Sequence, residues 1–129
     1  FVQDQKTELL ERLEKYFKNS DAKMTQERYL KMCEQMGKEP DPEEMPPDLE
    51  DFPEIVIQAL TTFSYLGDRI YPDIGYMGKD FTNLSHYLDI NGIEDTELFL
   101  EILTYLESRA IKQSQESLKR EREKLKRKN

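Results

Sequence analysis

Few residues in this chain have the types and the spacing that catalysis or metal binding requires. The chain holds one histidine, His86, and one cysteine, Cys33. A general base or a zinc ligand needs partners at short, defined spacing, and neither residue has them. We therefore interpret His86 as a structural or surface histidine and Cys33 as a buried core thiol. The sequence predicts no catalytic residue, no metal ligand and no cofactor, and indicates that the protein is not an enzyme.

One segment, Gly75-Tyr76-Met77-Gly78-Lys79-Asp80, resembles part of a phosphate-binding loop. It lacks the preceding strand, the full glycine spacing and the serine or threonine that follows the lysine in such loops. We instead expect a shaped loop that delivers Asp80 as the N-cap of the next helix.

Charge is distributed unevenly along the chain, whose net charge is −8. Lys38 to Glu54 contains eight acidic residues and one basic residue, and Lys112 to Asn129 contains eight basic and three acidic residues. The acidic stretch lacks the ligand spacing of an EF-hand, and its prolines exclude that loop, so we interpret it as a solvated linker. The opposite charges indicate electrostatic docking of a partner, or of a second copy head to tail.

The basic end admits two functional interpretations besides that of a solvated terminal helix. Its lysines and arginines suit either nucleic acid or an acidic protein. Aromatic residues are absent from it, glutamates dilute its charge, and the rest of the chain is acidic enough to repel phosphate. We therefore favour a protein partner and keep nucleic acid as the alternative. The candidate contact residues here are Lys119, Arg120, Lys124 and Arg127.

Helical patterns account for most of the elements that must position these residues. Apolar residues recur at helical spacing in five segments: 3–18, 25–36, 51–66, 81–90 and from 95 onward. No segment alternates apolar and polar residues as a half-buried strand does. The sequence predicts an all-α fold, a small four- to five-helix bundle with a projecting charged C-terminal helix.

The ends of these helices carry recognisable signals. We expect Thr25 and Asp51 to cap helices, because short polar side chains accept hydrogen bonds from the first helical N–H groups. A further helix should start near Asp95. Gly37 and Gly92 are expected to end helices in the left-handed conformation.

A seven-residue repeat continues into the C-terminal helix. Ile111, Leu118 and Leu125 hold one position of the repeat, but the companion position is occupied by polar residues, Glu107, Ser114 and Glu121. A two-stranded coiled coil needs both positions to be apolar. We therefore expect one continuous, solvated helix.

The composition of the chain, 129 residues at 36% hydrophobic and 36% charged, indicates one small domain. We assign residues 24–111 to a helical core that includes an acidic, proline-rich connector over 38–50. Residues 112–129 form a basic C-terminal helix. Met24 resembles a translation start, so residues 1–23 are interpreted as an N-terminal helical extension that derives from a tag, a fusion or an upstream reading frame.

The absence of a long apolar stretch and of a signal peptide predicts a protein outside the membrane. The lone cysteine excludes an internal disulfide and suggests a reducing compartment. We therefore expect a cytoplasmic location.

Four short motifs lie between residues 52 and 112: Phe52-Pro53-Glu54, Ala59-Leu60-x-x-Phe63-x-x-Leu66, Gly78-Lys79-Asp80-Phe81-x-x-Leu84 and Asn91-Gly92-Ile93. With the long final helix, they resemble the small tail-assembly chaperones of tailed bacteriophages. The chain departs from that pattern at Phe52, where the family has tryptophan, and at Lys79, where it has an apolar residue. The resemblance implies a protein of the host cytoplasm that holds a long tape-measure protein until tail tube subunits polymerise around it.

Two classes of function follow. The first is a binding and assembly factor for a phage structural protein, with self-association as a further option. The second is a nucleic-acid-associated regulator or packaging adaptor that uses the basic helix. For the first class, we expect partner contacts at apolar positions outside the core: Leu9, Leu13 and Phe17, and on the central helix Ile55, Ile57 and Tyr65.

Overall fold

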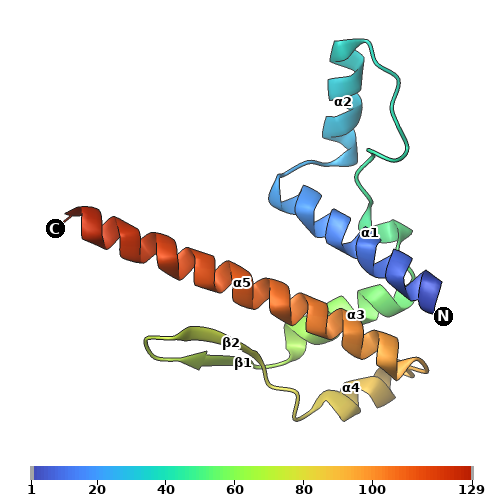
Figure 1. Ribbon diagram of the computed structural model, residues 1–129. Coiled ribbons are helices and arrows are strands. Elements are labelled where there is room, and N and C mark those ends of the chain that lie inside the picture. The colour runs from blue at the N-terminus through green and yellow to red at the C-terminus, as the bar shows by residue number, and fades with distance from the viewer. Residues whose placement is uncertain (1, 129) are drawn as a thin grey trace. The chain divides into compact units, whose positions relative to one another are not determined.

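The computed structural model describes residues 2–128 and divides the chain into two compact units, Phe1–Pro53 and Glu54–Asn129. The segment boundaries expected at residues 23 and 111 remain predictions. The chain is mostly helical, with one small two-stranded sheet (Figure 1). The all-α prediction is therefore right for the helices and wrong for residues 68–79.

The first unit contains the helices α1 (Gln3–Asp21) and α2 (Gln26–Met36) and the short 3-10 helix η1 (Leu49–Asp51). Thr25 begins α2 as predicted, because its hydroxyl accepts a hydrogen bond from the backbone N–H of Arg28 at 3.1 Å. Gly37 ends α2 in the left-handed conformation, at φ 65°. Residues 37–48 then run without a helix or strand, whereas the last two residues of the predicted connector, Leu49 and Glu50, belong to η1.

Phe52 belongs to the first unit and packs within it. Its side chain is buried, lies edge-on to Tyr16 at 5.8 Å between ring centroids, and carries the Arg12 guanidinium 5.5 Å above its ring. Asp51 does not cap the next helix as predicted. Its carboxylate instead accepts a hydrogen bond from the Asp48 N–H at 3.2 Å, within η1, and Pro53 separates it from the helix start.

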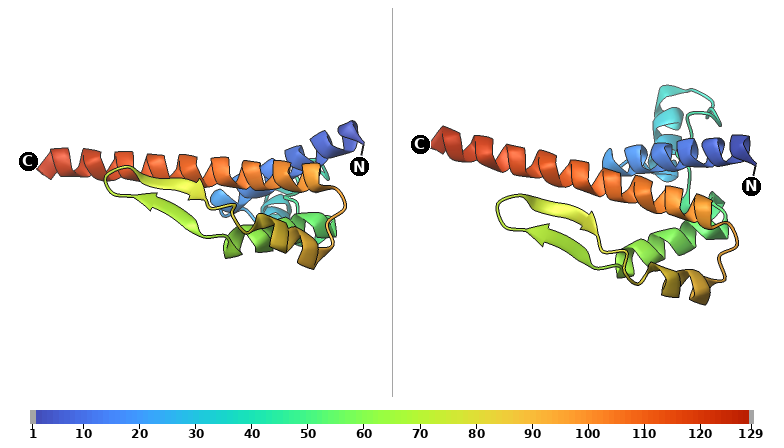
Figure 2. Two further views of the ribbon diagram at one scale, coloured as in Figure 1. Left: turned by 90° about the horizontal axis from the view of Figure 1, so that it is seen from below. Right: turned by 60° about the horizontal axis from the view of Figure 1, so that its bottom comes forward.

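The second unit is built on the helices α3 (Glu54–Tyr65), α4 (Leu84–Asn91) and α5 (Thr96–Lys128). α3 packs along the first part of α5 (Figure 2). α5 starts beside Asp95 as predicted, and the Asp95 carboxylate accepts a hydrogen bond from the Leu98 N–H at 3.0 Å. Gly92 ends α4 at φ 60°. The buried apolar core is contributed by Val56, Ala59, Leu66, Leu98, Phe99, Ile102, Leu103 and Leu106.

The segment predicted as a loop forms an antiparallel hairpin of β1 (Asp68–Tyr71) and β2 (Gly75–Lys79). Asp68 pairs with Lys79 and Ile70 pairs with Tyr76, so three steps along β2 match two along β1. This irregularity contains Gly78, at φ 111°, a conformation that favours glycine. Short strands interrupted by glycine lack the alternating pattern that would have identified them.

The start of α4 also differs from the prediction. α4 begins at Leu84 rather than near Phe81. The Asp80 carboxylate accepts hydrogen bonds from the backbone N–H and the hydroxyl of Thr82, at 2.9 and 2.5 Å, and so forms a local turn instead of a helix cap. These two bonds lower the pKa of Asp80.

Candidate partner-binding surfaces

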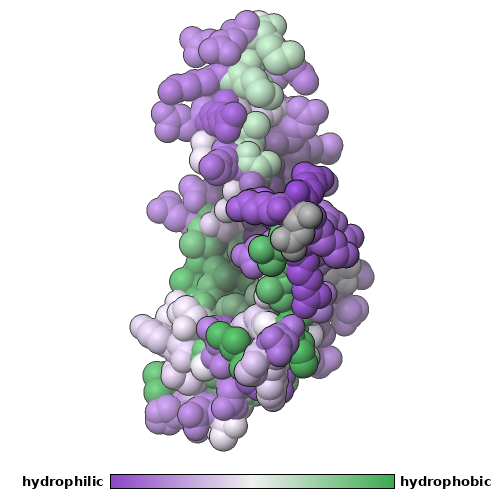
Figure 3. All heavy atoms as spheres, turned by 90° about the vertical axis from the view of Figure 1, so that its left-hand side faces the viewer, coloured by the Kyte–Doolittle hydropathy of each residue, from purple (hydrophilic) through white to green (hydrophobic). Residues whose placement is uncertain are grey.

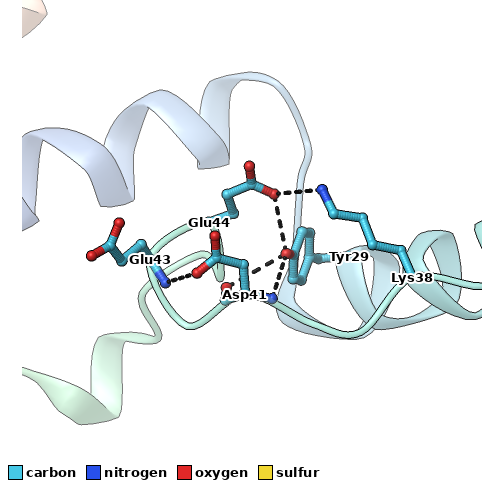
Figure 4. Close-up of polar contacts among 5 residues, drawn as sticks. All are labelled: Tyr29, Lys38, Asp41, Glu43 and Glu44. Carbon is cyan, nitrogen blue, oxygen red and sulfur yellow. Dashed lines mark hydrogen bonds and ion pairs between the residues drawn. The ribbon is translucent and has the colours of Figure 1, made fainter.

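The acidic connector is held in a defined conformation by Tyr29 (Figure 4). The phenolic oxygen of this buried residue of α2 accepts from the backbone N–H of Asp41 at 3.0 Å and lies 3.3 Å from a Glu44 carboxylate oxygen. The bond from Asp41 lowers the pKa of Tyr29, but burial and the nearby Cys33 and Glu44 outweigh it, so the net shift is upward. The neutral phenol is thus the stable form in the folded unit.

Further contacts anchor the connector along its length. Gln26 donates its side-chain N–H to the backbone oxygen of Pro46 at 2.9 Å, and the Lys15 ammonium donates to the backbone oxygen of Glu43. A groove of about 460 Å³ lies beside this anchor, lined by residues of α1, α2 and the connector, among them Tyr16, Asn19 and Pro47. The backbone of the connector is fixed, while most of its carboxylates point into solvent.

In the second unit, the hairpin docks on the seven-residue repeat of α5. A Cβ atom on Gly78 would lie 2.7 Å from a Glu107 carboxylate oxygen, and one on Gly75 would lie 2.7 Å from the Leu118 side chain and 3.7 Å from the Ser114 hydroxyl. The two glycines thus let the β2 backbone approach α5 closely. The seven-residue repeat of α5 therefore contacts a strand and not a second helix. Its polar positions, Glu107 and Ser114, lie beside the glycines of β2.

Lys79 fixes the base of the hairpin. Its backbone N–H donates to the Glu107 carboxylate at 2.8 Å, and its buried ammonium donates to the Leu66 backbone oxygen at 3.1 Å and pairs with Asp68 at 2.8 Å. The ammonium also lies 4.6 Å from the centre of the Phe63 ring. These contacts occupy the lysine of the glycine-lysine-aspartate motif, which therefore serves the fold.

Large apolar side chains remain exposed on the same unit. On the hairpin, Ile70 is 69% exposed and Ile74 is 60% exposed, and Tyr71 and Met77 are also exposed. Figure 3, which looks toward the free end of α5, shows green hydrophobic patches among purple hydrophilic atoms in this part of the molecule. We call Ile70, Tyr71, Ile74 and Met77 the hairpin patch.

The predicted apolar contact residues divide by burial. Leu9 and Leu13 are 6% and 0% exposed, so they have almost no surface left for a partner, and we withdraw them from the candidate set. Phe17 and Ile55 are half-buried. The exposed members are Ile57 and Tyr65, and the Tyr65 ring stacks on that of Tyr87 at 6.2 Å.

The predicted basic contact residues lie on the last part of α5, and their role in binding stays a prediction. Lys119, Arg120, Lys124 and Arg127 are all exposed on α5, which continues as one helix to Lys128. Arg120 donates to the backbone oxygen of Glu116, and Arg122 donates to the Asp73 backbone oxygen at the hairpin turn, 3.3 Å away. The turn of the hairpin thus contacts the basic part of α5 at Arg122.

His86 and Cys33 were the two residues considered for catalysis or metal binding. His86 is exposed and lies edge-on to Tyr87, and Cys33 is buried in α2. Within residues 2–128, no group of three or more histidine, cysteine, aspartate or glutamate side chains is arranged to hold a metal ion.

The hairpin patch and the role of Tyr29 were missed in the sequence. The turn signal Pro72-Asp73 between Ile70-Tyr71 and Tyr76-Met77 could have identified the hairpin. No local signal distinguishes Tyr29 from the other apolar residues of its helix, because its bonds reach a segment more than ten residues away.

Across the part of the chain that the structure describes, no helix is both long enough and apolar enough to cross a membrane. The chain matches no protein-family model, no curated protein and no solved structure.

Proposed function

We propose that the protein is a non-enzymatic assembly factor that resembles a phage tail-assembly chaperone and binds a long helical, tape-measure-type protein in the host cytoplasm. The observation that carries this proposal is the hairpin patch. Four large apolar side chains are held exposed on a two-stranded element whose position on α5 is fixed by the contacts of Lys79 and Glu107. A rigid, exposed apolar surface of this kind suits the apolar face of an amphipathic helix.

The charge of the molecule supports the same role. A chaperone must stay dissolved while it exposes apolar surface, and a net charge of −8 on 129 residues opposes aggregation. Ile57 and Tyr65 on α3 extend the exposed apolar surface of the same unit.

The test is co-expression with the long helical tape-measure-type protein that the proposal expects to be encoded beside this chain's gene. We expect the full chain to keep that protein soluble and to co-purify with it, and the double variant Ile70→Ser/Ile74→Ser to lose both effects. The matched control is Ile90→Ser, which alters an equally exposed isoleucine on α4. The absence of such a neighbouring gene, or equal loss in the control, would contradict the proposal.

A nucleic-acid-associated regulator or packaging adaptor is the second candidate. It is favoured by one observation, the exposure of every residue from Lys119 to Lys128 on a helix that is basic overall. Its test is salt-dependent binding to duplex DNA that disappears when residues 112–129 are removed.

A further inference from the structure

The end of α5, residues 119–128, is exposed along its length, and the hairpin turn contacts it at Arg122. All ten residues are exposed, and the hairpin reaches α5 only as far as Leu118 and Arg122. The seven-residue repeat nevertheless continues: Glu121 and Leu125 follow Ser114 and Leu118 at the same spacing, and Leu125 is 64% exposed. We call residues 119–128 the distal segment.

The distal segment is strongly basic. It contains seven basic and two acidic residues, a net charge of +5, so the other 119 residues carry −13 to give the total of −8. Two distal segments would therefore repel one another. The segment also lacks the aromatic side chains on which bases stack, and the rest of the chain opposes an approach to phosphate. Both facts favour an acidic protein surface as its partner.

The acidic connector in the first unit has the complementary properties. Glu39, Glu43 and Glu50 are exposed, and so are Asp48 and Asp51. One ion pair, between Lys38 and Glu44 at 3.6 Å, takes up a connector carboxylate. Because Tyr29, Gln26 and Lys15 hold the backbone, these carboxylates are presented without the entropic cost of ordering a flexible loop.

We propose that the distal segment of one copy docks on the acidic connector of a second copy. The interface joins two different surfaces, so a pair of copies keeps one unused connector, on the first copy, and one unused distal segment, on the second. Such a head-to-tail contact generates a ring if the rotation closes and an open chain if it does not. The inference goes beyond the proposed function and does not depend on it.

The experiment reverses the charge on each side separately. The distal variant carries Lys119→Glu, Lys124→Glu and Arg127→Glu, and the connector variant carries Glu39→Lys, Glu43→Lys and Glu50→Lys. In sedimentation equilibrium at low salt, the wild-type mass should rise with concentration above the monomer mass of 15.4 kDa, and it should return to that mass at about 0.5 M salt. Each variant alone should remain monomeric, with a dissociation constant raised about tenfold or more.

The decisive sample is an equimolar mixture of the two variants. In the mixture the acidic distal segment meets the basic connector, and the unaltered pair also matches, so association should return. A control variant with Lys18→Glu, Arg28→Glu and Lys31→Glu makes the same change of charge at exposed positions outside both surfaces and should associate as the wild type does. Far-ultraviolet circular dichroism confirms that each variant is folded.

Several results would overturn the proposal. A wild-type mass of one copy at every concentration in low salt would exclude it, and so would a mixture that stays monomeric. Equal loss of association in the control variant would show a non-specific charge effect. Binding of wild-type protein to a duplex oligonucleotide, abolished by the distal variant and without self-association, would assign the segment to nucleic acid instead.

Discussion

Both units of this protein bury apolar side chains, and the first also fixes an exposed connector through polar contacts. In the second unit, buried apolar side chains of α3 and α5 form a continuous core that includes Val56, Phe99 and Leu103. In the first, the contacts that fix the connector are polar: a phenol, an amide and an ammonium each bind backbone atoms. Apolar burial is non-directional, whereas hydrogen bonds fix particular atoms. The second unit can therefore support an exposed apolar hairpin, while the first presents charge from a defined loop.

The largest effect should come from truncating the core of the second unit. Phe99 is fully buried, and Phe99→Ala should lower the free energy of unfolding by about 3–5 kcal/mol. Urea denaturation followed by circular dichroism measures the change. The neighbouring Leu100 is 43% exposed, so Leu100→Ala serves as the control and should cost less than about 1 kcal/mol. Equal losses would show that Phe99 lies outside the cooperative core.

The next effect concerns how the hairpin docks on α5. Gly78→Ala combines an unfavourable φ of 111° with a Cβ atom 2.7 Å from the Glu107 carboxylate, and should cost about 2 kcal/mol. Faster amide exchange across β2 would report the loosened hairpin. Gly67→Ala is the matched control, because a Cβ atom there meets nothing within 4 Å. If Gly78→Ala matched this control, the close approach of β2 to α5 would be disproved.

A smaller, more local effect is expected in the first unit. Tyr29→Phe removes the oxygen that binds Asp41 and lies beside Glu44, at a cost of about 1–2 kcal/mol. Limited proteolysis should show faster cleavage within the connector while the helix content stays unchanged. Tyr71→Phe changes an exposed tyrosine and should leave the cleavage rate as it was. Unchanged cleavage in Tyr29→Phe would mean that the contacts of Gln26 and Lys15 fix the loop without the phenol.

The smallest effect is expected at Tyr76, whose hydroxyl, unlike that of Tyr29, does not hold a loop. The buried Tyr76 hydroxyl has no hydrogen-bond partner among residues 2–128, so Tyr76→Phe should be neutral or stabilise the fold by up to about 1 kcal/mol. Burial, followed by the charges of Asp68 and Glu107, raises the pKa of Tyr76.

This shift predicts an alkaline dependence of a defined sign. The folded state favours the neutral phenol, so its contribution to stability is complete below the unfolded pKa of about 10 and is lost as pH rises through the folded pKa. Denaturation at about pH 8 and about pH 10.5 should show a smaller loss in Tyr76→Phe than in the wild type. Identical losses would contradict the burial of this hydroxyl.

The parts that sequence analysis predicted correctly depend on neighbouring residues. Thr25, Gly37, Gly92 and Asp95 lie at the helix ends where their local chemistry placed them. The acidic connector is also irregular, because proline excludes a helix interior. In each case, the interacting atoms are within a few residues of one another.

The parts that were missed depend on distant residues. Asp51 and Asp80 have the chemistry of helix caps, but η1 and a turn at Thr82 take up their carboxylates. The repeat in α5 has the pattern of an incomplete coiled coil. Only the structure shows that Gly75 and Gly78 of the hairpin lie close to its side chains. The predicted basic contact residues are exposed, as charged side chains on a terminal helix usually are, and their role in binding stays a prediction. Leu9 and Leu13, by contrast, are apolar residues that the chain itself buries.

The continuity of α5 has a mechanical consequence. One unbroken helix of 33 residues is about 50 Å long, and residues 123–128 follow its contact with the hairpin turn at Arg122. Because the helix is continuous, a small tilt where the hairpin docks is passed on to its C-terminal end. A tilt of about 10° at Leu118 would move Lys128 by about 2–3 Å. A change in how β2 docks on α5 would therefore displace the C-terminal end of the helix while the helix itself stays folded.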